Sequence, residues 1–403
     1  MKLLAIIGFA FVSPQLTFAE TTTSPIELAD RAGRFILDDK FTIPPDRSNR
    51  FWGNSEAIKL GEALFFDARL SADETVACAS CHVTDGNFVP NETIPAQDDR
   101  KFRAVMPIAG ASIQDFFFWD GRADSLWAQA LGPLENPTEH GLTRTEVVQI
   151  ALQNYRSEFI DLNIIEADFE FESVGAASPI GSRTQRENWR NLSNETQEQV
   201  NRVFSDIGKI IASFETTIVP PTTEFDEVAL LAQTDPSALY RISASALNGL
   251  DLFSGRARCS TCHAGPLFTD ADFHNTGMPQ RDGFPIDMGR QAVIRQIERQ
   301  EFGCLGEYSD AGEDDCPHVT YMNLSMERAM GAFRTPSLRQ VSERTTFGHA
   351  GQFNSLRDIV RHYNEAPASV HGNLTGQGNT SELIPLGLTE DEISDIVAFL
   401  ELL

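Results

Sequence analysis

Two short cysteine motifs limit what this chain can fold into more than any other feature. Residues 78–82 read CASCH and residues 259–263 read CSTCH. The two thiols of a C-x-x-C-H motif add to the vinyl groups of a haem, and the histidine that follows lies beneath the iron as an axial ligand. A zinc ribbon holds its cysteine pairs closer together than these motifs are, and a redox dithiol rarely carries the following histidine.

We therefore predict two covalently bound haem c groups. The predicted axial ligands are His82 and His263, and the predicted thioether positions are Cys78, Cys81, Cys259 and Cys262. Because the haems supply much of each core, we expect a mostly α-helical protein with two cytochrome c-like domains and long loops.

The pattern of apolar residues favours helices over strands. Apolar side chains between residues 200 and 214 recur at helical spacing, which predicts a long amphipathic helix that ends before Pro220-Pro221. Thr389 and Glu392 form a capping box for a last helix. No stretch alternates convincingly for a strand.

An internal repeat organises the chain. Related segments stand in the same order in both halves, namely GEALF at 61–65 and GLDLF at 249–253, FR at 102–103 and 333–334, and FFWDGRADSL at 117–126 and FGHAGQFNSL at 347–356. The length of 403 residues also suggests two domains. We predict a duplicated one-haem unit, with an N-terminal domain at 20–220 and a C-terminal domain at 221–403.

The first residues have the pattern of a secretory signal. Lys2 precedes the apolar stretch 3–12, and Thr17-Phe18-Ala19 offers a small-residue cleavage site before Glu20. A spanning helix needs about 20 apolar residues, and no later segment is that long and apolar. We predict a signal peptide at 1–19 and a soluble periplasmic protein. An uncleaved N-terminal anchor is the alternative.

The two remaining cysteines and the net charge agree with export. In an exported protein, Cys304 and Cys316 are expected to form a disulfide around the acidic loop 309–315, with a metal site as the weaker alternative. A formal net charge of −26 disfavours binding to nucleic acid or to anionic membrane surfaces. The acidity would steer a partner with a basic face, or it keeps an exported protein soluble.

Several segments resemble one family over nearly all of the mature chain. Residues 117–141 read FFWDGRADSLWAQALGPLENPTEHG, residues 333–339 read FRTPSLR, and residues 356–364 read LRDIVRHYN. With the two haem motifs, these segments resemble the bacterial di-haem cytochrome c peroxidase and MauG family. Mapped by this resemblance, the inter-haem tryptophan is Trp119, the distal glutamine is Gln129, the nearby proline is Pro133, and the acid/base residue is Glu139.

The resemblance implies a role for each of these side chains. A carboxylate such as Glu139 in a partly dry pocket can move a proton between the two peroxide oxygens. The amide of Gln129 can orient peroxide or water, and the π system of Trp119 can carry an electron or a hole between the haems. Taken without the resemblance, the same residues are a loop acid, a helix-surface amide and a core aromatic.

The repeat predicts that the two haems differ in their sixth iron ligand. When Trp119 is aligned with His349, Pro133 falls opposite Tyr363. Proline cannot bind iron, so the N-terminal haem is expected to be open and the C-terminal haem closed by Tyr363. The family has methionine here in its peroxidases and tyrosine in MauG. Alternative ligands are His362 and the helically spaced methionines Met322, Met326 and Met330.

Three departures from the family pattern stand out. Residues 83–118 contain no histidine that could close the first haem, so no reductive activation should be needed. His140 follows Glu139, which adds a second titratable group at the edge of the pocket. At the places of the family's inter-haem calcium, the chain reads RAV at 103–105 and RTT at 344–346, so an oxygen ligand is lost and a cation stands nearby. These residues argue against calcium.

The expected function is peroxide reduction at the His82 haem, with electrons passing through the second haem and Trp119. The external donor would be a small cytochrome or copper protein. A tyrosine ligand lowers a haem potential, which favours instead a MauG-like oxidase that modifies a protein substrate. A non-catalytic electron carrier is the third possibility, and it would need His274, His318 or a methionine to close the first haem.

Overall fold

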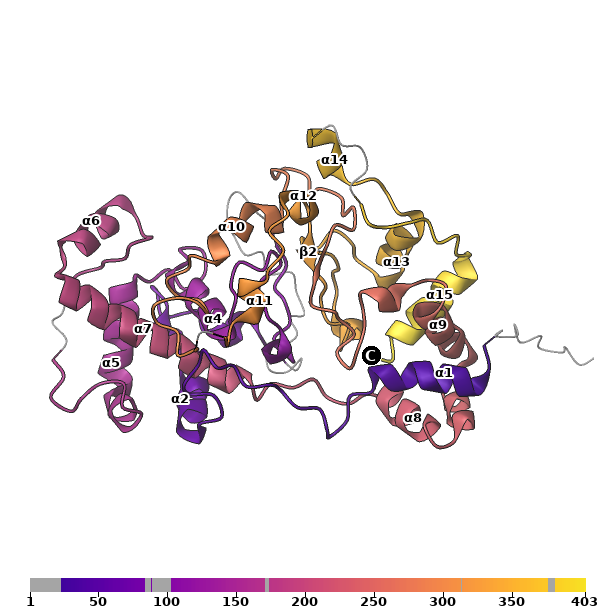
Figure 1. The fold of residues 1–403 in the computed structure, drawn as a ribbon, viewed down its shortest axis with the longest axis horizontal. Helices are drawn as coiled ribbons and strands as arrows, with labels where there is room; N and C mark the ends of the chain where they lie inside the picture. The colour runs from indigo at the N-terminus through magenta and orange to yellow at the C-terminus, as the bar shows by residue number, and fades with distance from the viewer. Residues whose placement is uncertain (1–22, 84–87, 89–102, 171–173, 313, 376–380) are drawn as a thin grey trace, which may run out of the picture.

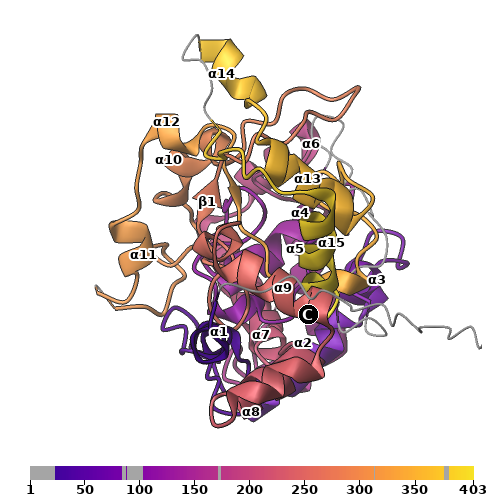
Figure 2. The ribbon, with the colours of Figure 1, turned by 90° about the vertical axis from the view of Figure 1, so that its right-hand side faces the viewer.

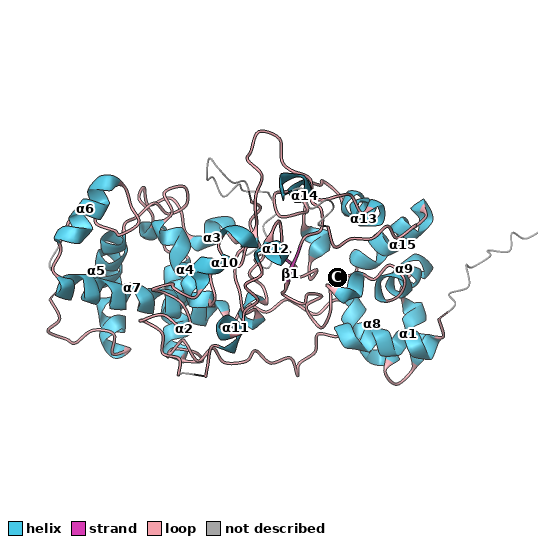
Figure 3. Ribbon diagram, turned by 45° about the horizontal axis from the view of Figure 1, so that its top comes forward, coloured by secondary structure: helices cyan, strands magenta, loops and turns pink. Residues whose placement is uncertain are grey.

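The computed structural model describes residues 23–83, 88, 103–170, 174–312, 314–375 and 381–403, and the predicted signal peptide lies outside these ranges. The molecule is elongated, with one group of helices at each end (Figure 1). Helices and loops make up almost all of it (Figure 3), so the predicted helical fold class is confirmed. Within the described ranges, no helix combines the length and the apolar character needed to cross a bilayer.

The helices are unevenly divided between the two ends of the molecule. The group at the left of Figure 1 contains α2 (Ser55–Phe65), α4 (Leu126–Glu135), α5 (Arg144–Asp161), α6 (Arg183–Asn191) and α7 (Asn194–Glu215). The short helix α3 (Cys78–Cys81) is labelled in Figure 3, nearer the middle of the molecule. The group at the right contains α1 (Pro25–Ala32), α8 (Glu224–Ala232), α9 (Ala244–Ser254), α13 (Leu356–Glu365) and α15 (Glu390–Leu400). Shorter helices lie between or above them, namely α10 (Ile294–Ile297), α11 (Pro317–Thr320), α12 (Met326–Ala329) and α14 (Val370–Thr375).

The long amphipathic helix and the capped last helix are both found where the sequence predicted them. α7 covers the apolar repeat, and its residues from 203 to 215 are buried. Thr389 is the N-cap of α15, and its backbone N–H donates to Glu392 across the capping box. Local sequence patterns therefore located the helices that close each half.

The two halves repeat the same helix packing. α2 packs on α7, and α9 packs on α15. Each contact has a glycine at its closest point, because a Cβ at Gly61 would strike the Ile210 carbonyl and a Cβ at Gly249 would strike the Asp395 carbonyl. A glycine at the same register in both pairs supports the duplication seen in the sequence.

The segments that follow the haem motifs also repeat. An isolated antiparallel bridge joins Phe117 to Ala123 in the first half, and another joins Phe347 to Phe353 in the second. Both bridges lead into a serine-capped helix of the same length, α4 or α13. Pro133 and Tyr363 therefore occupy equivalent turns of equivalent helices.

Two apolar cores hold the ends of the molecule together. The first is built from residues between 51 and 218, and the second from residues between 225 and 403 together with α1. Leu28 and Ala29 of α1 are buried against this second core, beside α8 and α9 (Figure 2). The chain thus begins its described part at one end of the molecule and then crosses to the other. The domain division at residue 220 remains a prediction.

A small sheet lies between the halves. Its strands are β1 (Phe273–His274) and β2 (Phe333–Arg334), which pair in antiparallel fashion. The backbone N–H of Arg334 also donates to the carbonyl of Trp119, over 2.9 Å. This bond connects the start of the first half's FFWDGRADSL segment directly to the second half.

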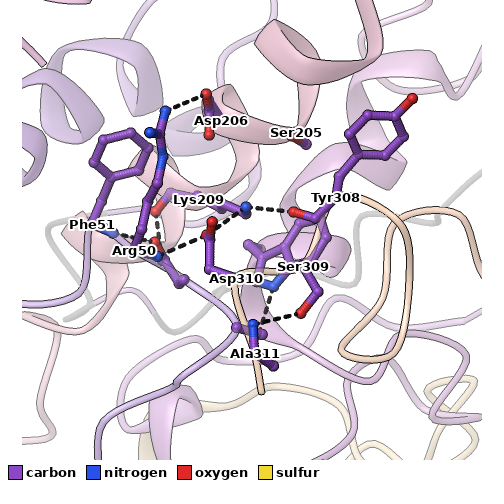
Figure 4. A network of polar contacts seen from close by, with 12 residues as sticks. Arg50, Phe51, Ser205, Asp206, Lys209, Tyr308, Ser309, Asp310 and Ala311 are labelled. Carbon is purple, nitrogen blue, oxygen red and sulfur yellow. Dashed lines mark hydrogen bonds and ion pairs between the residues drawn. The ribbon is translucent and has the colours of Figure 1, made fainter. Parts of the chain in front are cut away.

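The loop between Cys304 and Cys316 of the C-terminal half packs against the N-terminal half and binds Lys209. Lys209 of α7 is 3% exposed, and its Nζ lies 2.5 Å from the Tyr308 carbonyl and 2.6 Å from Asp310 Oδ2 (Figure 4). Asp310 also accepts from the backbone N–H of Arg50. The disulfide between Cys304 and Cys316 closes this loop, which confirms the predicted pairing.

Candidate active site

The second cysteine motif lies on the wall of the larger cavity. This cavity has a volume of about 570 Å³ and is lined by Cys259, Cys262, His263 and Tyr363 among mostly apolar side chains. That volume is in the range of protein cofactor sites. The residues present therefore fit a haem, since two thiols, an imidazole and a largely apolar wall line one cavity.

The orientation of His263 suits an iron ligand. Its backbone N–H donates to the Cys259 carbonyl over 2.9 Å, which closes the turn of the motif. On the ring, Nδ1 lies 2.9 Å from the Phe268 carbonyl, so it carries the hydrogen and donates it. A neutral imidazole held in this way keeps Nε2 unprotonated and free to bind a metal.

Tyr363 and His362 are neighbours on α13, but their side chains lie in different surroundings. Tyr363 lines the cavity, whereas His362 is buried beside it, with Nε2 2.8 Å from the Thr276 carbonyl. The alternative methionine ligands are also placed elsewhere, because Met322, Met326 and Met330 are not among the described residues that line the cavity. Met322 instead directs its sulfur to Arg290, 2.9 Å away.

The first cysteine motif forms α3 at the edge of the N-terminal core. Cys78 packs against this core, and the backbone N–H of His82 donates to the Cys78 carbonyl over 3.0 Å, as in the second motif. His82 Nδ1 is buried and has no hydrogen-bond partner among the described residues. Most of the segment that follows His82 lies outside those residues.

The predicted distal residues come from α4 and the turn after it. Gln129 and Pro133 are half-buried and stand one helical turn apart, so they share a face of α4. Glu139 follows in the turn, where its backbone N–H donates to the Asn136 carbonyl and its carboxylate accepts from Asn136 Nδ2 over 2.9 Å. The structure thus brings Gln129, Pro133 and Glu139 into one short segment.

The environment of Glu139 suits proton transfer. Burial raises the pKa of its carboxyl, and the charge of Arg122 and the hydrogen bond from Asn136 offset only part of that effect. The Arg122 guanidinium is itself fixed, 3.5 Å from the centre of the Phe118 ring and 3.1 Å from Asp120. A carboxyl with a raised pKa can exchange a proton closer to neutral pH than an exposed glutamate can.

His140 is a buried anchor of the turn that carries Glu139. It is 4% exposed, and its Nδ1 lies 2.5 Å from the Leu70 carbonyl. Burial lowers its pKa, although the hydrogen bond to Leu70 partly opposes this effect. A neutral ring that donates to a carbonyl fixes the turn, and it adds no charge beside Glu139 at neutral pH.

Trp119 stands at the junction of the halves. It is 5% exposed, lines the large cavity and donates from Nε1 to the Ala104 carbonyl over 2.8 Å. The backbone N–H of Ala104 donates in turn to the His349 carbonyl, and the rings of Trp119 and His349 meet edge to face at 6.3 Å. Trp119 and its repeat counterpart are therefore in contact across the junction.

The residues at the family's calcium position do not fit a divalent cation. Arg344 Nη2 lies 3.4 Å from the Val105 carbonyl, an oxygen that would otherwise be available to a metal. Arg103 lies on the same segment, bound to Asp120 at 2.6 Å and to Asp287 at 2.7 Å. The Arg344 guanidinium already occupies the Val105 carbonyl and would repel a calcium ion there, and the Asp120 and Asp287 carboxylates are taken up by Arg103.

Some features of the site carried no recognised signal in the sequence. Glu215 is 4% exposed at the end of α7, and burial raises its pKa to about 8. Arg334 and Arg344 line the large cavity. Comparison of FR at 102–103 with FR at 333–334 could have singled out Arg334.

The two histidines considered as ligands of the first haem have other partners. His274 is held by Asp270 and Glu382, and His318 lies at the Asp124 carbonyl.

A helical chain with two C-x-x-C-H motifs in a duplicated unit defines a di-haem c-type cytochrome. The model of the di-haem cytochrome c peroxidase family matches residues 55–234. The cytochrome-c peroxidase IdrP1 of Denitromonas iodatirespirans is 30% identical over 356 residues, which cover 87% of this chain and 81% of that protein. The chain belongs to the di-haem cytochrome c peroxidase family and is an oxidoreductase with two haems.

Other similar proteins include both a peroxidase and MauG proteins, the two kinds of family member that the sequence resembles. The methylamine utilization protein MauG of Methylorubrum extorquens is 29% identical over 412 residues, covering 99% of this chain and 92% of that protein. Among solved structures, the di-haem peroxidase BthA of Burkholderia thailandensis has a TM-score of 0.59 at 18% identity, covering 91% of this chain and 88% of that one. A MauG-like protein associated with microbial copper homeostasis has a TM-score of 0.58 at 22% identity, covering 91% and 95%. These two structures support the fold.

Proposed function

We propose that the protein reduces hydrogen peroxide to two water molecules at its N-terminal haem, using two protons and two electrons from an external donor. The observation that carries this proposal is the contrast between Pro133 and Tyr363 at equivalent turns of α4 and α13. Proline has no side-chain atom that binds iron, so a haem bound in the first half would stay open to peroxide, whereas the phenol of Tyr363 could bind the iron of a haem in the second half.

We propose that both haems are attached covalently through thioether bonds, at Cys78 and Cys81 and at Cys259 and Cys262. All four cysteines are half-buried and unpaired, as attachment sites need to be before the haem is added. His82 and His263 would hold the irons from the proximal side. When bound, the haems supply the redox chemistry, and the protein supplies access, orientation and proton transfer.

We propose that Glu139 is the proton shuttle. Its ionised carboxylate takes the proton from the inner peroxide oxygen and returns it to the outer oxygen, which leaves as water. Gln129, on the same face of α4 as Pro133, would orient the peroxide with its amide. Asn136 holds the Glu139 carboxylate in place, and the buried ring of His140 holds the turn.

Electrons would reach the first haem through Trp119, whose ring lines the second haem's cavity at the junction. The net charge of −26 favours an external donor with a basic face, such as a small cytochrome or a copper protein. Tyr363 also favours a second candidate function, a MauG-like oxidation of a protein substrate, because phenolate ligation stabilises ferric iron. The two functions differ in whether the partner protein is recovered unchanged.

We propose that the protein is exported to the periplasm. The predicted signal at 1–19 and the disulfide between Cys304 and Cys316 agree with an oxidising compartment. We further propose that calcium is absent between the halves, since Arg344 and Arg103 stand at its position. Incubating the purified protein with a chelator should then leave its peroxidase activity unchanged.

Low-temperature EPR of the ferric protein, before and after stoichiometric peroxide, tests the proposed function. We expect one high-spin and one low-spin haem, with both signals lost on adding peroxide. In Tyr363→Phe the low-spin signal should change while the high-spin signal persists. Two low-spin signals that do not respond to peroxide would overturn the proposal and indicate an electron carrier. Mass spectrometry of a candidate partner after turnover separates the two catalytic functions.

A further inference from the structure

Two arginines that line the large cavity have no carboxylate partner within the described part of the chain. Arg334 is 4% exposed, and its Nη1 has no hydrogen-bond partner among the described residues. Its other nitrogens make long contacts, from Nε to the Phe118 carbonyl at 3.4 Å and from Nη2 to Met106 Sδ at 3.2 Å. Arg344 reaches the Val105 carbonyl, also at 3.4 Å. Both guanidinium groups therefore contribute uncompensated positive charge to the wall of the cavity.

The repeat shows how unusual this state is. Arg103 is the first-half counterpart of Arg334, and its guanidinium is bound by Asp120 and Asp287 with distances of 2.6 and 2.7 Å. Arg334 occupies the equivalent place after the equivalent phenylalanine, yet no ion pair of the described residues includes it. The first half thus neutralises this cation internally, and the second half leaves it facing the cavity.

A buried guanidinium without an anion is costly. Burial lowers the pKa of Arg334 to about 9 and that of Arg344 to about 10. Arg290 is also buried and forms no ion pair with the residues that the structure describes, but its guanidinium lies 3.8 Å and 4.3 Å from the ring centres of Phe273 and Phe116, whose faces attract a cation. For Arg334 and Arg344, an anion bound in the cavity would remove the cost.

We infer that Arg334 and Arg344 bind the two propionate carboxylates of the haem in the large cavity. The inference rests on the proposed haem attachment at Cys259 and Cys262 and is independent of the peroxide reaction. A haem carries two carboxylates, and arginine is well suited to bind them because its planar fork of N–H groups matches a carboxylate. The number and the location of the uncompensated cations thus match the ligand.

The inferred contacts affect the electron transfer properties of this haem. Positive charge beside a haem disfavours its ferric form and raises its reduction potential. Tyr363 has the opposite effect, since a phenolate stabilises ferric iron. The backbone of Arg334 is bonded to the Trp119 carbonyl, so the cation lies next to the proposed electron path. The two arginines would keep the potential of the second haem higher than tyrosine ligation alone would set it.

Spectroelectrochemical titration of the holoprotein tests this inference. Arg334→Gln should lower the reduction potential of the second haem and make it vary between pH 6 and 8, because a propionate without its cation takes up a proton more readily. Arg334→Lys keeps the charge and should retain most of the wild-type potential. Arg290→Gln is the matched control, a buried arginine outside the cavity, and it should leave the potential unchanged. A wild-type potential in Arg334→Gln with both haems bound would overturn the inference.

A second measurement decides the case even if Arg334→Gln does not fold. Resonance Raman spectra of the wild-type protein report the propionate bending modes of the haem. These modes should stay constant between pH 5 and 8 if the propionates are paired with arginine, and they should shift in Arg344→Gln. If the propionates of the wild type titrate as exposed carboxylates do, the inferred arginine contacts are overturned. The proposed haem attachment is not affected by that result. A pyridine haemochrome count of one haem per chain would overturn the proposed second haem site instead.

Discussion

The two halves of the molecule share one scaffold and differ where chemistry is decided. In chain order, both have a glycine where two helices pack, then a C-x-x-C-H motif, and then a bridged turn that leads into a serine-capped helix. At equivalent turns of those helices, one half has Pro133 and the other has Tyr363. Under the proposed function, this single difference on a duplicated framework would separate an open haem site from a closed one.

A second difference concerns charge. The first half has Glu139, a carboxyl with a raised pKa, in the turn after α4, while the second half has Arg334 and Arg344 along its cavity. A proton shuttle is useful where a bond to oxygen breaks, and fixed positive charge is useful where an electron is stored. The duplication supplied two similar frameworks, and a few polar residues specialised each of them.

Closing the first site should have the largest effect. Pro133→Tyr places a phenol on the N-terminal half where Tyr363 stands on the other, so the high-spin signal should disappear and peroxide turnover should be abolished. EPR and a steady-state peroxidase assay measure the two changes. Pro137→Ala, in the exposed turn beyond α4, serves as a control for loss of a proline. A high-spin signal that survives in Pro133→Tyr would show that residue 133 does not overlie the haem.

Removing the proton shuttle should have the next largest effect. Glu139→Gln should lower kcat by about 10²-fold or more, the usual contribution of general acid–base catalysis, with both haem spectra unchanged. Glu62→Gln changes an exposed carboxylate on α2 and should have no effect. Full activity in Glu139→Gln would assign proton transfer to another group.

The pH profile sharpens the same assignment. Glu139 acts in its ionised form and its pKa is raised, so activity should fall on the acid side at a pH above the ordinary glutamate value of 4.5. Stopped-flow rates of peroxide reaction against pH would locate this limb. The limb should vanish in Glu139→Gln, whereas a limb that persists would belong to a different residue.

The contacts of Lys209 on α7 with Tyr308 and Asp310 should matter more for stability than for activity. Lys209→Met breaks the buried contacts with Tyr308 and Asp310 and should cost about 3 kcal/mol of unfolding free energy, measured by denaturant titration of the holoprotein. Lys59→Met, which removes an exposed pair with Glu56, should cost less than about 1 kcal/mol. An equal loss of unfolding free energy in the two variants would mean that the contacts of Lys209 do not hold the halves together.

Acid should weaken the junction between the halves by a smaller amount. Burial raises the pKa of Asp287, but the hydrogen bond and charge of Arg103 outweigh it and lower the pKa to about 2. Asp287 therefore contributes about 2 kcal/mol above its unfolded pKa of about 4, and that contribution is lost as the pH falls through about 2. Thermal unfolding of wild type and Asp287→Asn between pH 2 and 6 should converge at the acid end. Parallel curves would contradict this pairing.

Sequence alone located the features that depend on neighbouring residues. The amphipathic pattern of α7, the capping box at Thr389 and the Cys304–Cys316 pairing were all predicted and are confirmed. The duplicated turns were visible because the same short signals occur twice. The roles of Glu139, Gln129, Trp119 and Tyr363 remain predictions that came from the family resemblance.

Features that depend on distant contacts were not visible. Helix α1 has an ordinary amphipathic pattern, and nothing in it indicates that it packs against residues some two hundred positions later. The sequence around Arg334 gives no sign that its side chain lines a cavity or that no described carboxylate pairs with it. Burial and pairing arise from tertiary structure, so propensity and spacing could not supply them.

The two halves also exchange pieces, since α1 completes the C-terminal core and the loop around Tyr308 and Asp310 fastens the N-terminal helices. Each half is therefore completed by a segment that belongs, in sequence, to the opposite half. During synthesis, α1 must wait for α8 and α9 to emerge, and α7 must wait for the loop around Tyr308 and Asp310. Cutting the gene at the repeat boundary would leave two fragments that each lack a segment held by the other.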